Sequence, residues 1–189
     1  MSLVVQRYQF TVDDFTRMVA TGIIDEHDRV ELIDGEVRQM SPIGPLHMFL
    51  VNRLNAILTK QLGDRAIVSV QNAVILNDFT EPQPDFSILR PRKDFYRHAV
   101  ARPKDVLLLI EVADTSLEYD RDEKVPRYAK MRIPAVWLVD GNNEQVTRYD
   151  HPRAGSYRQI HAFGPGDELA SITIDSLRIP INDLFLIGR

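Results

Sequence analysis

The chain has 189 residues, of which 44% are hydrophobic and 26% charged, a composition typical of one globular domain spanning residues 1–189. It contains no cysteine, which excludes disulfides and thiolate nucleophiles or metal ligands, and its net charge of -4 does not indicate a nucleic-acid binder. We expect neither a signal peptide nor a membrane span, because no basic segment with a long apolar run opens the chain and no run of about 18 apolar residues occurs. A cytoplasmic location is compatible with these features.

The first elements are a short helix and a hairpin. Thr11-Val-Asp-Asp14 has the pattern of a capping box and predicts an amphipathic helix that ends near Gly22. Residues 31–38 are typical of a hairpin, because Asp34-Gly35 supplies the positive φ that a tight turn requires.

A long helix follows over residues 46–62, with Gly63 at the expected stop. Its leucines and isoleucine fall on one face: Leu46, Leu50, Leu54, Ile57, Leu58 and Leu62. Strands are predicted at 65–70 and 73–76, and then at 83–89.

The second half of the chain alternates again. Residues 106–112 are apolar at consecutive positions, as in a strand covered on both faces. A second capping-box pattern predicts a helix over residues 120–131, and residues 135–139 and 145–149 are predicted strands. Shorter strands are expected around 157–163 and 171–175.

This order predicts an α/β fold in which helices flank a mixed β-sheet. The strand–helix–strand segment 105–139 is expected to form a right-handed crossover, which makes its two strands parallel.

Two of the apolar strands each carry one acid, Asp85 in the first and Glu111 in the second. Buried carboxylates need a partner, and two neighbouring ones are usually relieved by a shared proton or a divalent cation. Oxygen ligands suit Mg²⁺ or Mn²⁺. A metal or catalytic pair and two acids held by structural partners both remain open. Lys124, in the following helix, could stabilise developing negative charge, or it could be an ordinary surface lysine.

Residues 90–104 combine basic and aromatic side chains: Arg90, Arg92, Lys93, Phe95, Tyr96, Arg97, His98, Arg102 and Lys104. Such a loop could contact phosphates and bases, or it could be an ordinary solvated loop.

The chain resembles the PD-(D/E)XK phosphodiesterase superfamily, and within it the Uma-type restriction endonucleases. The matching pieces span nearly the whole chain in order: Glu31-Leu-Ile-Asp-Gly-Glu36, Met40-Ser-Pro with His47, Pro84-Asp85, Glu111-Val112, Asp120-Arg-Asp-Glu-Lys124 with Tyr128-Ala129, and Ala135-Val-Trp-Leu-Val-Asp140. The resemblance implies a restriction-endonuclease-like αβββαβ core, preceded by the N-terminal helix and hairpin, and a metal-dependent nuclease that acts on DNA.

The resemblance also implies roles for individual residues. Asp85 and Glu111 would ligate Mg²⁺ or Mn²⁺, with the carbonyl of Val112 as a third protein ligand. The pattern departs from the superfamily at Ala113, where a lysine is expected, and Lys124 would substitute for it.

The other candidate residues each have an alternative. Glu31 is a candidate third acid, or a cross-strand partner of Arg38. His47 is a candidate for phosphate binding or proton transfer, or a local hydrogen-bonding residue. Asp120 is interpreted as an N-cap. Tyr128 and Trp137 are interpreted as core residues.

Nucleases of this type often dimerise to cut two strands, so a homodimer is a further expectation. The hairpin and Leu184–Ile187 are weak candidates for its interface. Two alternatives to an active nuclease are open: an inactive nuclease-fold module that binds nucleic acid or a protein, favoured by Ala113 and the acidic total, and a structural protein with buried ion pairs.

Overall fold

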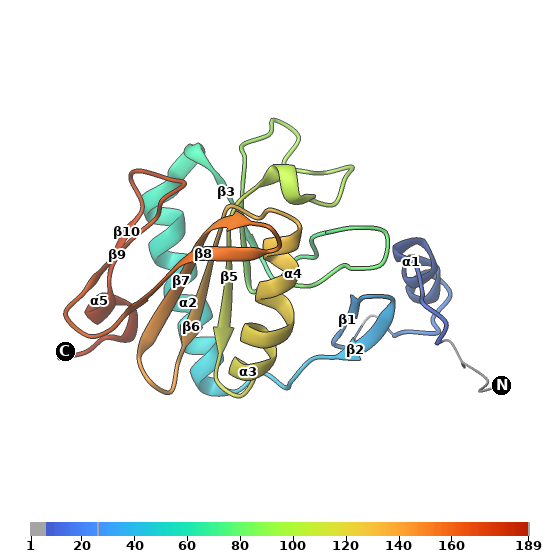
Figure 1. The fold of residues 1–189 in the computed structure, drawn as a ribbon, viewed down its shortest axis with the longest axis horizontal. Coiled ribbons are helices and arrows are strands. Elements are labelled where there is room, and N and C mark those ends of the chain that lie inside the picture. The colour runs from blue at the N-terminus through green and yellow to red at the C-terminus, as the bar shows by residue number, and fades with distance from the viewer. Residues whose placement is uncertain (1–6, 26, 189) are drawn as a thin grey trace.

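The computed structural model describes residues 7–25 and 27–188 (Figure 1). In chain order its elements are α1 (Val12–Ala20), β1 (Val30–Ile33), β2 (Glu36–Gln39), α2 (Pro45–Leu62), η1 (Gly63–Arg65), β3 (Ile67–Val70), β4 (Phe86–Leu89), η2 (Pro103–Asp105), β5 (Val106–Ala113), α3 (Leu117–Tyr119), η3 (Asp120–Lys124), α4 (Val125–Lys130), β6 (Ala135–Asp140), β7 (Gln145–Arg153), β8 (Ser156–Phe163), β9 (Glu168–Ala170), β10 (Arg178–Pro180) and α5 (Ile181–Phe185). Among the described residues no helix is long and apolar enough to cross a membrane.

The centre of the fold is a six-stranded sheet in the order β3-β4-β5-β6-β7-β8. Strands β5 and β6 are parallel and every other neighbouring pair is antiparallel. The predicted parallel pairing across the 105–139 segment and the predicted mixed α/β sheet are therefore confirmed. Two small antiparallel sheets, β1-β2 and β9-β10, lie outside the main sheet.

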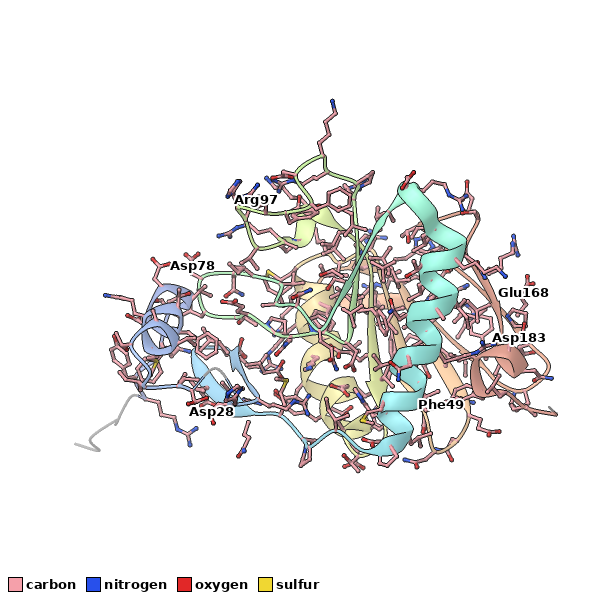
Figure 2. All side chains as sticks on the ribbon, turned by 180° about the vertical axis from the view of Figure 1, so that it is seen from behind. Asp28, Phe49, Asp78, Arg97, Glu168 and Asp183 are labelled. Atoms are coloured by element: carbon pink, nitrogen blue, oxygen red, sulfur yellow. The ribbon has the colours of Figure 1, made fainter. Side chains whose placement is uncertain are left out.

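Helices cover both faces of this sheet. On one face α2 packs its leucines against Phe86, Ile110 and Trp137. On the other face α4 packs Val125 and Tyr128 against the strand side chains that point away from α2. Figure 1 shows α4 in front of the sheet, and Figure 2, which views the molecule from the opposite side, shows α2 in front of it. Because both faces are covered, β5 is apolar at nearly every position, as its sequence predicts.

The N-terminal helix and hairpin form as predicted and lie to one side of the sheet (Figure 1). The Thr11 hydroxyl accepts a hydrogen bond from the Asp14 amide at 3.1 Å, and the Asp14 carboxylate accepts one from the Thr11 amide at 3.0 Å. Both turn residues of the hairpin have positive φ, 49° at Asp34 and 77° at Gly35. This is the geometry that a two-residue hairpin turn needs.

Two predicted strands are wrong. Residues 73–76 make only an isolated bridge, between Val74 and Ala101, although Val74 and Leu76 are buried. Residues 171–175 form no strand, and β9 and β10 flank that segment instead. In both places apolar residues are buried beneath loops rather than within a strand ladder, so hydrophobicity correctly indicated burial but not pairing.

The C-terminal segment proposed as an interface belongs largely to the core of this chain. Leu184 and Phe185 of α5 are buried and pack in the same cluster as α2. These two side chains are therefore not available to a second copy, and a homodimer remains a prediction with the hairpin as its other candidate surface.

Candidate active site

Asp85 and Glu111 occupy opposite positions at the same end of strands β4 and β5, with Asp85 directly before β4. Phe86 of β4 pairs with Ile110 of β5 in antiparallel register, so the next positions outward are Asp85 and Glu111. Side chains directly opposite in an antiparallel pair project to the same face. The sequence prediction that these acids lie close together on neighbouring strands agrees with this register.

Asp85 is held by three hydrogen-bond donors. Its Oδ1 lies 3.0 Å from His47 Nε2 and 3.2 Å from Gln71 Nε2, and its Oδ2 accepts a bond from the Val112 amide at 2.9 Å. Burial by itself would raise the pKa of Asp85, but the hydrogen bond and charge of His47, together with the bonds from Val112 and Gln71, lower it. The pKa of His47 is raised, because Asp85 accepts from its ring.

Glu111 lies deeper, with only 2% of the residue exposed. The hydroxyl of Tyr128 donates to its Oε1 at 2.5 Å. Burial raises the pKa of Glu111 well above its usual value, and the charges of Asp120 and Asp85 act in the same direction, while Lys124 opposes them. Tyr128 is thus a core residue, as predicted, and also a hydrogen-bond donor to the site.

Lys124 stands among three carboxylates and is itself buried. Its Nζ lies 3.3 Å from Glu31 Oε2, 3.5 Å from Glu111 Oε1 and 3.6 Å from Asp120 Oδ1. Burial alone would lower the pKa of Lys124, but these acids raise it far above the usual lysine value, so the group is an ammonium ion. The surface-lysine alternative is wrong, since the residue is 5% exposed.

The hairpin contributes Glu31 to the same cluster. Besides Lys124, Glu31 accepts hydrogen bonds from the Gln83 amide and the Tyr119 hydroxyl, both at 3.1 Å. Although Arg38 lies opposite Glu31 in the register, its guanidinium pairs with Glu36 and Glu123 instead. The structure thus brings Glu31 into the site rather than into a cross-strand ion pair.

The interpretation of Asp120 as an N-cap is wrong. The helical segment begins earlier, at Leu117, and Asp120 opens one turn of π-helix that ends at Lys124. Its carboxylate accepts a hydrogen bond from Ser116 Oγ at 2.6 Å. The helical spacing of Asp120, Lys124 and Tyr128, each four residues apart, was the available signal that they share one face.

Glu31, Glu111, Asp120 and Lys124 line a pocket of about 340 Å³, together with His47, Asp85 and Val112. Two arginines, Arg29 and Arg38, lie on its wall. Tyr119 and Gln71 also line the pocket, and the sequence had indicated neither of them. A pocket that joins buried acids, one ammonium and two guanidinium groups can accommodate an anionic group such as a phosphate.

The cluster has more carboxyl groups than basic groups. Four carboxylates, those of Glu31, Asp85, Glu111 and Asp120, face one ammonium and one imidazole. Such an excess of oxygen donors fits a hard divalent cation such as Mg²⁺ or Mn²⁺ in chemistry and in charge. Within residues 7–25 and 27–188 no group of three or more His, Asp or Glu side chains is arranged to hold a metal ion in this conformation.

The mixed sheet with helices on both faces, and the acid–lysine cluster at one end of its strands, define a restriction-endonuclease-like α/β protein, the fold class that the sequence predicts. A family model, Uma2, described as "Putative restriction endonuclease", matches residues 12–182, and the chain belongs to this family.

A solved structure has the same fold. It is the crystal structure of "a putative nuclease belonging to DUF820 from Anabaena variabilis ATCC 29413", which matches with a TM-score of 0.75 and 17% identity over 94% of this chain and 98% of that one. The comparison with curated proteins found no match.

Proposed function

We propose that this protein is a metal-dependent endonuclease that hydrolyses phosphodiester bonds in DNA. Its membership of a family described as restriction endonucleases supports nuclease activity. The observation that carries the proposal is the position of Lys124, whose ammonium lies within 3.6 Å of three carboxylates in a pocket that also contains Asp85.

Asp85 and Glu111 would hold the cation, with the carbonyl of Val112 as a further ligand. When bound, Mg²⁺ or Mn²⁺ polarises a phosphoryl oxygen and lowers the pKa of a coordinated water. The Val112 amide and Tyr128 hydroxyl hold the two acids in position, since each donates to one of them. Acids oriented by such neighbours are better ligands than freely rotating ones.

Lys124 acts as a fixed positive charge rather than a base, because three carboxylates keep it protonated. It lines the pocket, so a phosphate that enters meets its ammonium. A charge placed before the reaction begins stabilises the additional negative charge of a pentavalent phosphorus. In this way Lys124 takes over the role expected of a lysine at position 113, which Ala113 cannot perform.

His47 is the candidate for proton transfer. Its Nε2 faces Asp85, and its buried Nδ1 has no hydrogen-bond partner among the described residues. An imidazole held on one side by a carboxylate can carry a proton to or from a bound group. Glu31 and Asp120 orient Lys124 through their ion pairs with it.

An inactive module that binds nucleic acid is the second candidate. One observation favours it: the acids of the site are already paired with Lys124 and His47 in the protein itself. Such pairing could be structural rather than catalytic.

The test uses supercoiled, linear and single-stranded DNA with Mg²⁺ or Mn²⁺, and compares wild type with Asp85→Ala and Lys124→Met. Lys60→Met, an exposed position on α2, serves as the matched control for loss of a lysine. We expect cutting by wild type and the control, and loss of at least about 100-fold in both site variants. Equal cutting by all four proteins would refute the assignment. Salt-sensitive binding without any cutting would favour the inactive module.

A further inference from the structure

The loop of residues 90–104 lies at the other end of the sheet from the pocket. It leaves β4 after Leu89 and enters β5 at Val106, whereas the pocket lies beside Glu111 and Val112 near the end of β5. Figure 1 shows this loop and α3 at opposite ends of β5. From Val106 to Glu111 the strand advances by five residues, or about 17 Å at about 3.3 Å per residue, so the loop belongs to a second surface.

This surface is basic in an otherwise acidic chain. Residues 90–105 include six Arg or Lys residues and two Asp residues. Asp94 pairs with Arg92 at 2.6 Å. Lys93 and Arg97 are both exposed, and neither forms an ion pair with another described residue. Figure 2 shows Arg97 at the outer margin of the molecule. Two unneutralised cations are therefore available to a polyanion.

The loop also presents an aromatic ring to solvent. Phe95 is 75% exposed, and it and Tyr96 have left-handed backbone conformations, with φ of 49° and 60°. This region is unfavourable for bulky residues and is found where surrounding contacts enforce it. Here the Tyr96 hydroxyl donates to the Arg90 carbonyl at 3.0 Å, and Arg92 stacks 4.4 Å from the Tyr96 ring. The loop is thus fixed in a shape that turns Phe95 outward.

A groove of about 530 Å³ adjoins the ring. One wall consists of loop residues Arg92, Lys93 and Phe95, and the other includes Ile67 and Val68 of β3, the edge strand. The lining also includes Asp64, and Lys93 is its one cation without an ion pair among the described residues. Apolar side chains beside an exposed ring, with Lys93 in the groove and Arg97 elsewhere on the same loop, match the chemistry of a nucleotide: a planar base next to a charged phosphate.

We propose that this surface binds single-stranded DNA, with a base stacked on Phe95 and phosphates contacting Lys93 and Arg97. The inference rests on the proposed function, because it takes DNA as the ligand class. Base faces are available for stacking only where the strand is unpaired, so a duplex would meet the cations but not the ring. The surface would hold DNA about 17 Å along the strand from the site of cutting.

The experiment measures binding of a labelled oligonucleotide of about 20 nucleotides, single-stranded or as a duplex, in EDTA so that cutting does not interfere. The variants are Phe95→Ala, Phe95→Tyr and Lys93→Glu/Arg97→Glu. Arg153→Glu/Arg158→Glu changes the net charge equally at exposed positions on β7 and β8 and is the matched control. Thermal unfolding checks that each variant is folded.

We expect Phe95→Ala to weaken single-strand binding at least about 5-fold, the effect of losing one base stacked on an aromatic ring, with little effect on duplex binding. Phe95→Tyr keeps an aromatic ring and should bind the single strand like wild type. Lys93→Glu/Arg97→Glu should weaken binding. It should also make the negative slope of log K against log salt shallower by about 1.4, the value expected for the loss of two phosphate contacts to a single strand. The control should change neither quantity to this extent.

Three outcomes would overturn the proposal. The first is equal binding by Phe95→Ala and wild type. The second is an equal effect of the loop and control charge reversals. The third is competition by polyglutamate as strong as that by single-stranded DNA, which would assign the surface to an acidic protein segment. The binding assay contains EDTA and the cutting assay contains Mg²⁺ or Mn²⁺, so a failed cutting test and a failed binding test are distinguishable.

Discussion

Replacing Lys124 with methionine tests whether its ammonium neutralises the buried acids. Methionine keeps the length of the side chain but leaves Glu31, Glu111 and Asp120, at most 4% exposed, without a cation. At about 3.5 Å and an effective dielectric constant of about 20, each contact corresponds to roughly 5 kcal/mol. The cost of removing the ammonium from water offsets most of the summed attraction to the three acids. Loss of one partner from a buried ion pair typically destabilises a protein by about 3–5 kcal/mol.

Urea unfolding measures this effect. With a slope of about 2 kcal/mol per molar urea, the midpoint of Lys124→Met should fall by about 2 M, while Lys60→Met should shift it little. Lys124→Met/Glu111→Gln should be more stable than Lys124→Met, because it removes one of the uncompensated charges. A loss below about 1 kcal/mol, or no recovery in the double variant, would refute the role of Lys124 as counter-ion.

Three further predictions concern other contacts. Tyr128→Phe removes the hydroxyl that donates to Glu111 and should destabilise the protein by about 1–3 kcal/mol in urea unfolding; no change would mean that Glu111 has another donor. Burial raises the pKa of Asp34, but Arg127 lowers it below its usual value. Arg127→Leu should therefore destabilise the protein fully above about pH 4, and this destabilisation should shrink as the pH falls through the lowered pKa of Asp34. A loss that is constant with pH would contradict this pairing. Leu184→Ala should cost about 2–5 kcal/mol without changing the elution volume in size-exclusion chromatography, whereas a shift in elution would restore this segment as an interface.

The main sheet could be predicted because its signals are local. The long helix, the buried strand β5 and the Asp34-Gly35 turn each follow from spacing or from the backbone needs of one or two residues. The facing of Asp85 and Glu111 followed from pairing two strands next to each other in sequence. Such inferences need no knowledge of distant contacts.

The rest depended on contacts between distant segments. Residues 73–76 look like a strand, yet their amide partners are loop carbonyls, including those of Thr80 and Ala101. Asp120 has the sequence of a cap, but the helix starts earlier and the residue turns toward Lys124. Tyr128 is a core residue by its hydrophobicity, and only the fold places its hydroxyl against Glu111.

The π-helical turn from Asp120 to Lys124 has a consequence for the length of this segment. A π-turn contains one residue more than an α-helical turn, and π-turns are frequent at functional sites. Deleting one residue between these two would leave an ordinary α-helical turn, in which acid and lysine, now three residues apart, still lie on the same face of the helix. The π-turn thus holds one extra residue without turning Lys124 away from the acids. A relative that is one residue shorter in this segment could keep the same cluster with a regular α-helix.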